Sequence, residues 1–182
     1  MLSQLILPIV LSTVALFIAS FLSWMVFQLH KKDWSPVEKE DDLMAAIAAF
    51  HLPVGSHMFP FAKSNECMKS ETFQKKYAAG PRGILTIMPT ANMGALLGQT
   101  VLYFLGVSFL LAYLASIAFH NQTDTSFMDV FRFVFTAGFM TFFAAILAHS
   151  IWFRARIVGH LIESLAYAAI VAVLFASLWP KA

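Results

Sequence analysis

Four long apolar runs constrain the fold of this chain more than any other feature. They cover about residues 5–29, 91–119, 127–150 and 157–179. Each is long enough to cross a bilayer core, which takes roughly 20 apolar helical residues. The chain is 59% apolar and 12% charged, whereas a soluble domain has about 45–50% and 25%. We therefore predict an all-α membrane protein, a single integral membrane domain over residues 1–182 with four transmembrane helices.

The distribution of basic residues predicts how these helices cross the membrane. Eight of the twelve Lys and Arg residues lie between the first and second runs, in a loop over residues 30–90. Loops rich in Lys and Arg stay on the cytoplasmic side. We therefore expect a cytoplasmic loop, both termini outside, and a bacterial inner membrane location. The eight residues are Lys31, Lys32, Lys39, Lys63, Lys69, Lys75, Lys76 and Arg82.

The cytoplasmic loop is expected to carry short amphipathic helices. Ser35 and Glu38 have the spacing of a capping box, which predicts a helix start there. A second helix is expected to begin at Ser70 and to end at Gly80. The apolar segment 84–88 is too short to span a bilayer, so we expect it to dip into the membrane interface.

Polar residues are expected to gather where the third helix ends and the fourth begins. Glu163 lies about one turn inside an apolar run, where an ionised carboxylate costs about 2.5–3.5 kcal/mol unless it is paired or protonated. It should therefore face the bundle. The predicted topology brings the following residues to the same side: Asn92, Gln99, His149, Arg154, Arg156, His160, Glu163 and Tyr167.

Two interpretations of this polar group stay open. In one, it is a cytoplasm-facing pocket in which Glu163 and His149 or His160 bind a polar ligand or move a proton, while Arg154 and Arg156 attract an anion. In the other, it is a structural cluster that joins two helices by hydrogen bonds. The sequence alone favours the structural interpretation.

The histidines and the single cysteine do not form a recognisable metal motif. His51, His57 and Cys67 share the loop, but their spacings match no zinc signature. A haem between His149 and His160 is stereochemically conceivable, but both residues are expected near the membrane surface. We therefore predict no metal and no cofactor.

Small residues on the second apolar run predict close helix packing. Gly94 and Gly98 form a GxxxG motif, and Gly106 continues the same face two turns later. Glycines at this spacing let two helix backbones approach closely. The contact could lie within the four-helix bundle or between two copies of the chain.

Several short motifs resemble an uncharacterised family of small bacterial membrane proteins. The resemblance covers most of the chain after the first helix. It implies a single four-helix domain, and it implies no activity and no site residue. The motifs are Phe73-Gln74-Lys75-Lys76, Gly80-Pro81-Arg82-Gly83, Met88-Pro89, Met93-Gly94, Ser150-Ile151-Trp152-Phe153 and Leu178-Trp179-Pro180.

Three classes of function remain possible at this point. The first is a non-catalytic protein, either an accessory subunit of a larger membrane complex or a binder of lipid or a small ligand. The second is a transporter or channel built by a homo-oligomer, and the third is a membrane enzyme that uses His149, His160 and Glu163. The basic residues are spread without interleaved aromatic side chains, so no nucleic-acid partner is expected.

Overall fold

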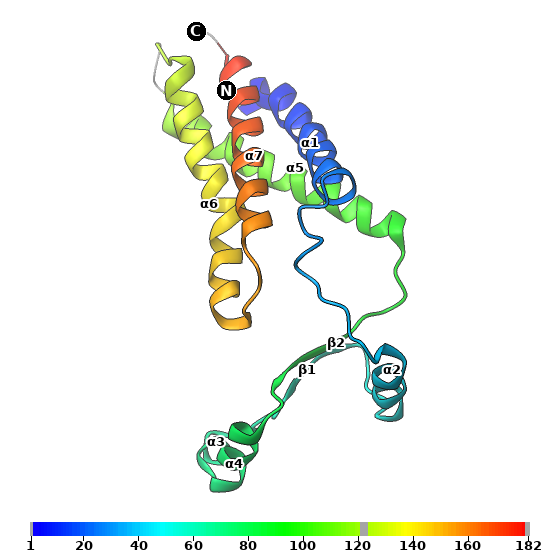
Figure 1. The fold of residues 1–182 in the computed structure, drawn as a ribbon. Helices are drawn as coiled ribbons and strands as arrows, with labels where there is room; N and C mark the ends of the chain where they lie inside the picture. The colour runs from blue at the N-terminus through cyan, green and yellow to red at the C-terminus, as the bar shows by residue number, and fades with distance from the viewer. Residues whose placement is uncertain (1, 121–123, 181–182) are drawn as a thin grey trace. The chain divides into compact units, whose positions relative to one another are not determined.

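Two compact units make up the fold, which a computed structural model describes for residues 2–120 and 124–180 (Figure 1). The first unit comprises residues 1–35 and 93–182, and the second comprises residues 36–92. The chain was predicted as one domain. Each unit is described by itself below.

The first unit is a helical bundle. Among the described residues, four helical segments are long and apolar enough to cross a membrane, as the sequence predicts. Their mean hydropathies lie between 1.9 and 2.6. The first segment is a 3-10 turn, an α-helix and a π-helical turn in succession, and each of the others is one α-helix. The elements are η1 (Leu2–Leu5), α1 (Ile6–Phe21), η2 (Leu22–Val26), α5 (Met93–Ala118), α6 (Phe127–Phe153) and α7 (Val158–Ser177).

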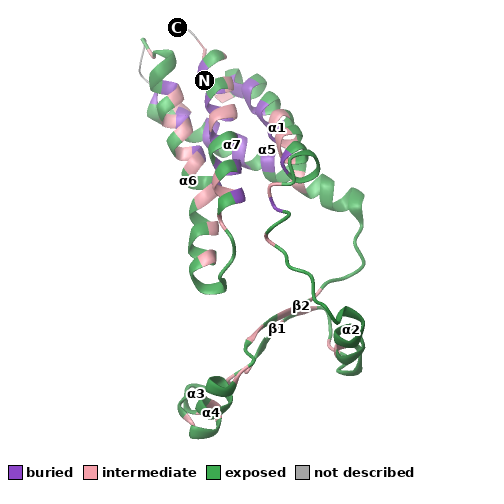
Figure 2. Ribbon diagram, in the orientation of Figure 1, coloured by how far each residue is buried: buried purple, intermediate pink, exposed green. Residues whose placement is uncertain are grey.

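Helix α7 is the most buried of the four because it packs along both α6 and α1 (Figure 2). Small residues make this possible: the Cβ position of Gly138 on α6 lies 3.5 Å from the Cα atom of Ala168 on α7. Large apolar residues fill the remaining space, and Leu16, Leu111 and Phe175 are almost fully buried. Close packing of these apolar side chains holds the helices together.

A capping box fixes the start of α6. The Ser126 hydroxyl accepts a hydrogen bond from the Asp129 backbone N–H, and the Asp129 carboxylate accepts hydrogen bonds from the Ser126 backbone N–H and hydroxyl. This satisfies amides that a helix N-terminus otherwise leaves without partners.

The second unit contains three short helices and a β-hairpin. An antiparallel ladder pairs β1 (Gly55–Phe59) with β2 (Gly83–Ile87), from Gly55 opposite Ile87 to Phe59 opposite Gly83. None of residues 36–92, all of which the structure describes, is buried (Figure 2). The helices are α2 (Glu40–Ala49), α3 (Asn65–Lys69) and α4 (Glu71–Ala79).

One loop prediction is wrong and one is confirmed. The capping box at Ser35 does not form, since α2 begins at Glu40 without a side-chain cap. The segment 84–88, expected to dip into the membrane interface, belongs mostly to strand β2 over residues 83–87, and its contact with a membrane stays a prediction. The helix predicted after Ser70 is present, with the Ser70 hydroxyl accepting from the Phe73 backbone N–H and Gly80 at its end.

Candidate functional site

The site begins where the first long apolar helical segment ends. The sequence predicts a helix that continues to residue 29, but the helix widens into the π-helical segment η2 and stops at Val26. Gln28 then takes a left-handed backbone conformation, with φ of 49°. A turn follows in which the Asp33 backbone N–H donates to the His30 carbonyl oxygen at 3.0 Å. This geometry brings His30 and Asp33 back to the end of the bundle, and π-helical segments often occur at such sites.

A glycine at the start of α7 lets this turn approach the helix. A Cβ atom at Gly159 would lie 3.0 Å from the Leu29 carbonyl oxygen and 3.1 Å from Cε1 of His30. Any larger residue would push the turn away. Arg156 holds the same turn from the α6–α7 connection, since its guanidinium donates to the Lys32 carbonyl oxygen.

His30 lies at the centre of the site and is 3% exposed. Its Nδ1 atom is 2.7 Å from Oδ2 of Asp33, and its Nε2 atom is 3.0 Å from Oε2 of Glu163. The second contact is an ion-pair distance without hydrogen-bond alignment, so Nε2 is a buried nitrogen that lacks a hydrogen bond. The ring also stacks on Trp24 of η2, with ring centroids 4.2 Å apart. His30 is therefore held by three side chains.

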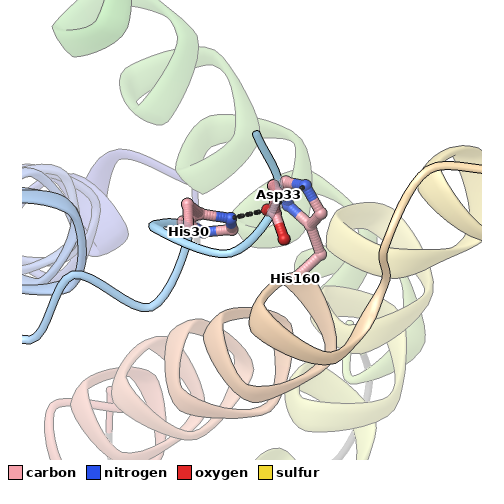
Figure 3. A group of neighbouring side chains, drawn as sticks. All are labelled: His30, Asp33 and His160. Carbon is pink, nitrogen blue, oxygen red and sulfur yellow. Dashed lines mark hydrogen bonds and ion pairs between the residues drawn. The ribbon is translucent and has the colours of Figure 1, made fainter. Parts of the chain in front are cut away.

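His160 completes the group from the first turn of α7 (Figure 3). Its ring centroid lies 4.4 Å from that of His30, and its Nε2 atom is 3.9 Å from Oδ2 of Asp33. The His160 side chain is 27% exposed and that of Asp33 is 16% exposed, so the group is reachable on this side. We call His30, Asp33, His160 and Glu163 the histidine–carboxylate cluster.

Glu163 is anchored from within the bundle. It is 8% exposed, and its Oε1 atom accepts a hydrogen bond of 2.8 Å from the Tyr167 hydroxyl one turn later on α7. The Tyr167 ring makes edge-to-face contacts with Phe104 of α5 and Phe142 of α6. Packing among three helices therefore positions Tyr167, and Tyr167 positions Glu163.

The structure brings together three of the eight predicted site residues, namely His160, Glu163 and Tyr167. Glu163 faces the bundle as expected, although its histidine contact is His30. His149 is exposed and stacks on Phe153, with ring centroids 4.5 Å apart, so it does not join the cluster.

Three more of the predicted residues, Arg154, Arg156 and Gln99, also lie outside the cluster. Arg154 is exposed at the end of α6, and Arg156 binds the turn backbone instead of forming an anion pocket. Gln99 is exposed on α5, and Asn92 belongs to the other compact unit.

The predicted glycine contact is not made within the chain at the positions that can be compared. A Cβ atom at Gly98 or Gly106 would have no neighbour within 4 Å, and Gly94 is exposed. In the bundle, Gly138 and Gly159 are the glycines with close neighbours among the described residues. Of the two alternatives, intrachain packing is therefore unsupported, and contact between copies stays a prediction.

Sequence reasoning missed His30, Asp33 and Trp24 because all were assigned to the first helix or to the following loop. A signal was present. His30 and Asp33 are three residues apart, directly after the first apolar run and on the same predicted side as His160. Residues at a helix exit can fold back beside the start of another helix, so this spacing is a usable signal.

The cluster combines two chemically different donor types. An imidazole between two carboxylates can donate to both of them as an imidazolium. A neutral imidazole can instead give one N–H to a carboxylate and offer its other nitrogen to a cation. In the first state the imidazolium, and in the second state a bound cation, would balance the negative charges of Asp33 and Glu163.

Comparisons with protein families, with curated proteins and with solved structures find no match for this chain. The resemblance to small bacterial membrane proteins therefore stays a prediction from sequence motifs.

Proposed function

We propose that this chain is a non-catalytic membrane protein that binds a small polar ligand at the histidine–carboxylate cluster. The observation that carries this proposal is the graded burial of the cluster. His30 and Glu163 are held inside the bundle, while Asp33 and His160 remain partly accessible. Asp33 and His160 are the two members that a polar ligand could reach, and His30 and Glu163 hold them in position from the buried side. Polar groups within membrane helices commonly mark binding sites or ion pathways.

A binding role fits the cluster better than an enzymatic one. The acid–base set expected from the sequence needs His149, and that residue is exposed beside Phe153. Without it, the remaining groups can bind and orient a ligand but do not form the predicted catalytic arrangement. A role as an accessory subunit is compatible with this interpretation.

For the location, we propose a bacterial inner membrane with residues 30–90 on the cytoplasmic side and both termini outside. The excess of Lys and Arg in this loop supports that orientation. The cluster would then open toward the cytoplasm, because it lies where the first helical segment ends and α7 begins, and the loop of residues 30–90 starts at the same end of that first segment.

Labelling of the single cysteine tests this orientation. Cys67 lies in the loop unit and is partly exposed. A membrane-impermeant maleimide should label it in inside-out vesicles and not from the periplasmic side of intact cells. His120→Cys in a Cys67→Ser background serves as the opposite control, since that residue follows α5 on the other side. Efficient periplasmic labelling of Cys67 would invert the topology.

The uncovered glycine face of α5 supports a homo-oligomer as an additional proposal. A Cβ atom at Gly98 or Gly106 would meet no described atom within 4 Å, and glycines on an apolar helix favour close approach of a second helix. A transporter or channel would need such an assembly, so this open face is the observation that favours the second candidate function. Membrane lipids are the other expected partner.

Native mass spectrometry of protein extracted with its own lipids tests the binding function. Wild-type protein should retain a bound species, and Glu163→Gln should lose it while keeping the fold, because the amide preserves shape and removes charge. His149→Gln is the matched control and should retain the species. A wild-type protein with no bound species, or a Glu163→Gln variant that binds normally, would contradict the proposal.

A further inference from the structure

We propose that His30, Asp33 and His160 bind a divalent first-row transition metal ion, and that Glu163 orients His30 for this purpose. This inference rests on the proposed binding function and specifies its ligand. It differs from the sequence expectation, which predicted no metal, because the fold brings residues 30, 33 and 160 together (Figure 3).

The ligand atoms have nearly the spacing that a metal requires. One donor atom from each of the three residues lies within 4.8 Å of the others. With metal–ligand bonds of 2.0–2.2 Å, neighbouring ligands of a tetrahedral ion are about 3.4 Å apart. Asp33 Oδ2 lies 2.7 Å from Nδ1 of His30 and 3.9 Å from Nε2 of His160. These two distances bracket the required value, so each must change by less than about 1 Å.

Glu163 has the place of the carboxylate that commonly supports a metal-bound histidine. If Nδ1 of His30 binds the ion, the proton must be on Nε2, which lies 3.0 Å from Oε2 of Glu163. A histidine that binds a metal usually donates its other N–H to such a group, which fixes its tautomer and ring orientation. The Tyr167 hydroxyl in turn holds Glu163 at 2.8 Å. The buried Nε2 atom has no hydrogen bond in the structure, and donation to Glu163 would give it a partner.

The charge of the cluster also calls for a cation. In the part of the chain that the structure describes, Asp33 and Glu163 make ion pairs with histidines only. With neutral imidazoles the cluster would carry two negative charges, one of them on a buried carboxylate. Uncompensated charge in a poorly solvated site is costly. A divalent ion would balance both carboxylates.

The donor types select the class of metal. Two imidazole nitrogens and one carboxylate oxygen suit zinc, iron and their neighbours in the first transition row, whereas magnesium and calcium prefer oxygen ligands. Three protein ligands also leave a fourth position. Because Asp33 and His160 are partly exposed, water or an exogenous ligand could reach the ion and occupy that position.

Metal titration of the full chain tests the inference. The protein would be purified in detergent without a histidine tag, treated with a chelator, and titrated with Co²⁺ and Zn²⁺. We expect one equivalent to bind, with visible Co²⁺ absorption bands that Zn²⁺ abolishes by displacement. Magnesium should not compete.

Matched variants locate the site. Asp33→Asn and His160→Gln change partly exposed residues and should weaken binding by about 100-fold or more, and Glu163→Gln by about 10–100-fold. His149→Gln removes an exposed histidine near the end of α6 and should bind like wild type. Circular dichroism of every variant checks that the bundle remains folded.

Two outcomes would overturn the metal site, and they are distinct from failure of the proposed function. One is wild-type protein that binds neither ion. The other is unchanged affinity in folded Asp33→Asn and His160→Gln variants. If either occurs while mass spectrometry still finds a Glu163-dependent bound species, the ligand is not a metal but the binding function stands. If that species is also absent, both proposals fail.

Discussion

The bundle unit and the loop unit differ in what holds their elements in place. In the bundle, residues such as Leu16, Leu111 and Phe175 are almost fully buried between helices. In the loop unit, backbone pairing between β1 and β2 and local helix caps provide order, and no residue is buried. A two-stranded hairpin without a packed face is at best marginally stable in water.

This difference explains where a precise site can form. A buried polar group needs neighbours that hold its partners in position, and the bundle supplies them through Tyr167 and its contacts with two other helices. In the loop unit, His51 and His57 are exposed or half-buried and lie on elements without a core. The bundle therefore holds its buried histidine in a fixed position, whereas the loop unit does not hold His51 and His57 in this way.

The largest contrast is expected from matched phenylalanine truncations. Phe175 is completely buried in the bundle, whereas Phe50 is 73% exposed in the loop unit. Phe175→Ala should lower the free energy of unfolding by about 3 kcal/mol through the cavity that it leaves. Phe50→Ala should leave it nearly unchanged. Denaturation of the α-helical signal in mixed micelles measures both, and equal effects would remove the distinction between the units.

Two glycine substitutions sharpen the comparison within the bundle. Gly159→Ala places a methyl group against the Leu29 carbonyl oxygen and the His30 ring, and should cost about 2 kcal/mol. Within one chain, a Cβ atom at Gly98 meets no described atom within 4 Å, so Gly98→Ala should stabilise the helix of the monomer by up to about 1 kcal/mol, since alanine is the better helix former. Unfolding in micelles gives both values. A neutral Gly159→Ala would mean that the turn at His30 is not held against α7.

Size-exclusion chromatography of Gly98→Leu extends this test. The substitution should disrupt an oligomer and leave the monomer fold intact, because the side chain has free space within the chain. Loss of the fold itself would show that Gly98 packs inside the bundle.

The smallest expected effect comes from a single hydroxyl. Tyr167→Phe keeps the aromatic packing and removes the hydrogen bond to Glu163, which should cost about 1 kcal/mol. Tyr113→Phe is the control, since that side chain is 48% exposed, and its effect should stay within about 0.5 kcal/mol. The same unfolding measurement applies. Indistinguishable variants would mean that Tyr167 contributes packing alone.

The four long apolar helices could be predicted because hydropathy over about 20 residues is a local property, and a run of this length favours a helix long enough to cross a membrane. The helix after Ser70 was also predictable, because its cap and its terminal glycine are short-range signals. The hairpin was not. Strand β2 pairs with residues about 30 positions earlier, and the local pattern of the segment 84–88 does not indicate which residues these are.

The candidate site was only partly predictable for the same reason. Glu163 could be placed inside the bundle from the cost of exposing a carboxylate to lipid. Its partner could not, because the His30 contact depends on where α1 ends. That end is set by the π-helical segment and by Gln28 in a left-handed conformation, two features without a clear sequence signature.

The pairing of Phe59 with Gly83 makes the far end of the loop a natural place to add sequence. The ladder already holds the two ends of residues 60–82 together, so extra chain placed between them does not change the span that the hairpin bridges. The entropy of closing such a loop grows only with the logarithm of its length, at about 0.6 kcal/mol for each doubling. Lys63 is exposed and lies between β1 and α3. A fluorescent reporter domain inserted after Lys63 should therefore report on the protein while the bundle and its cluster keep their structure.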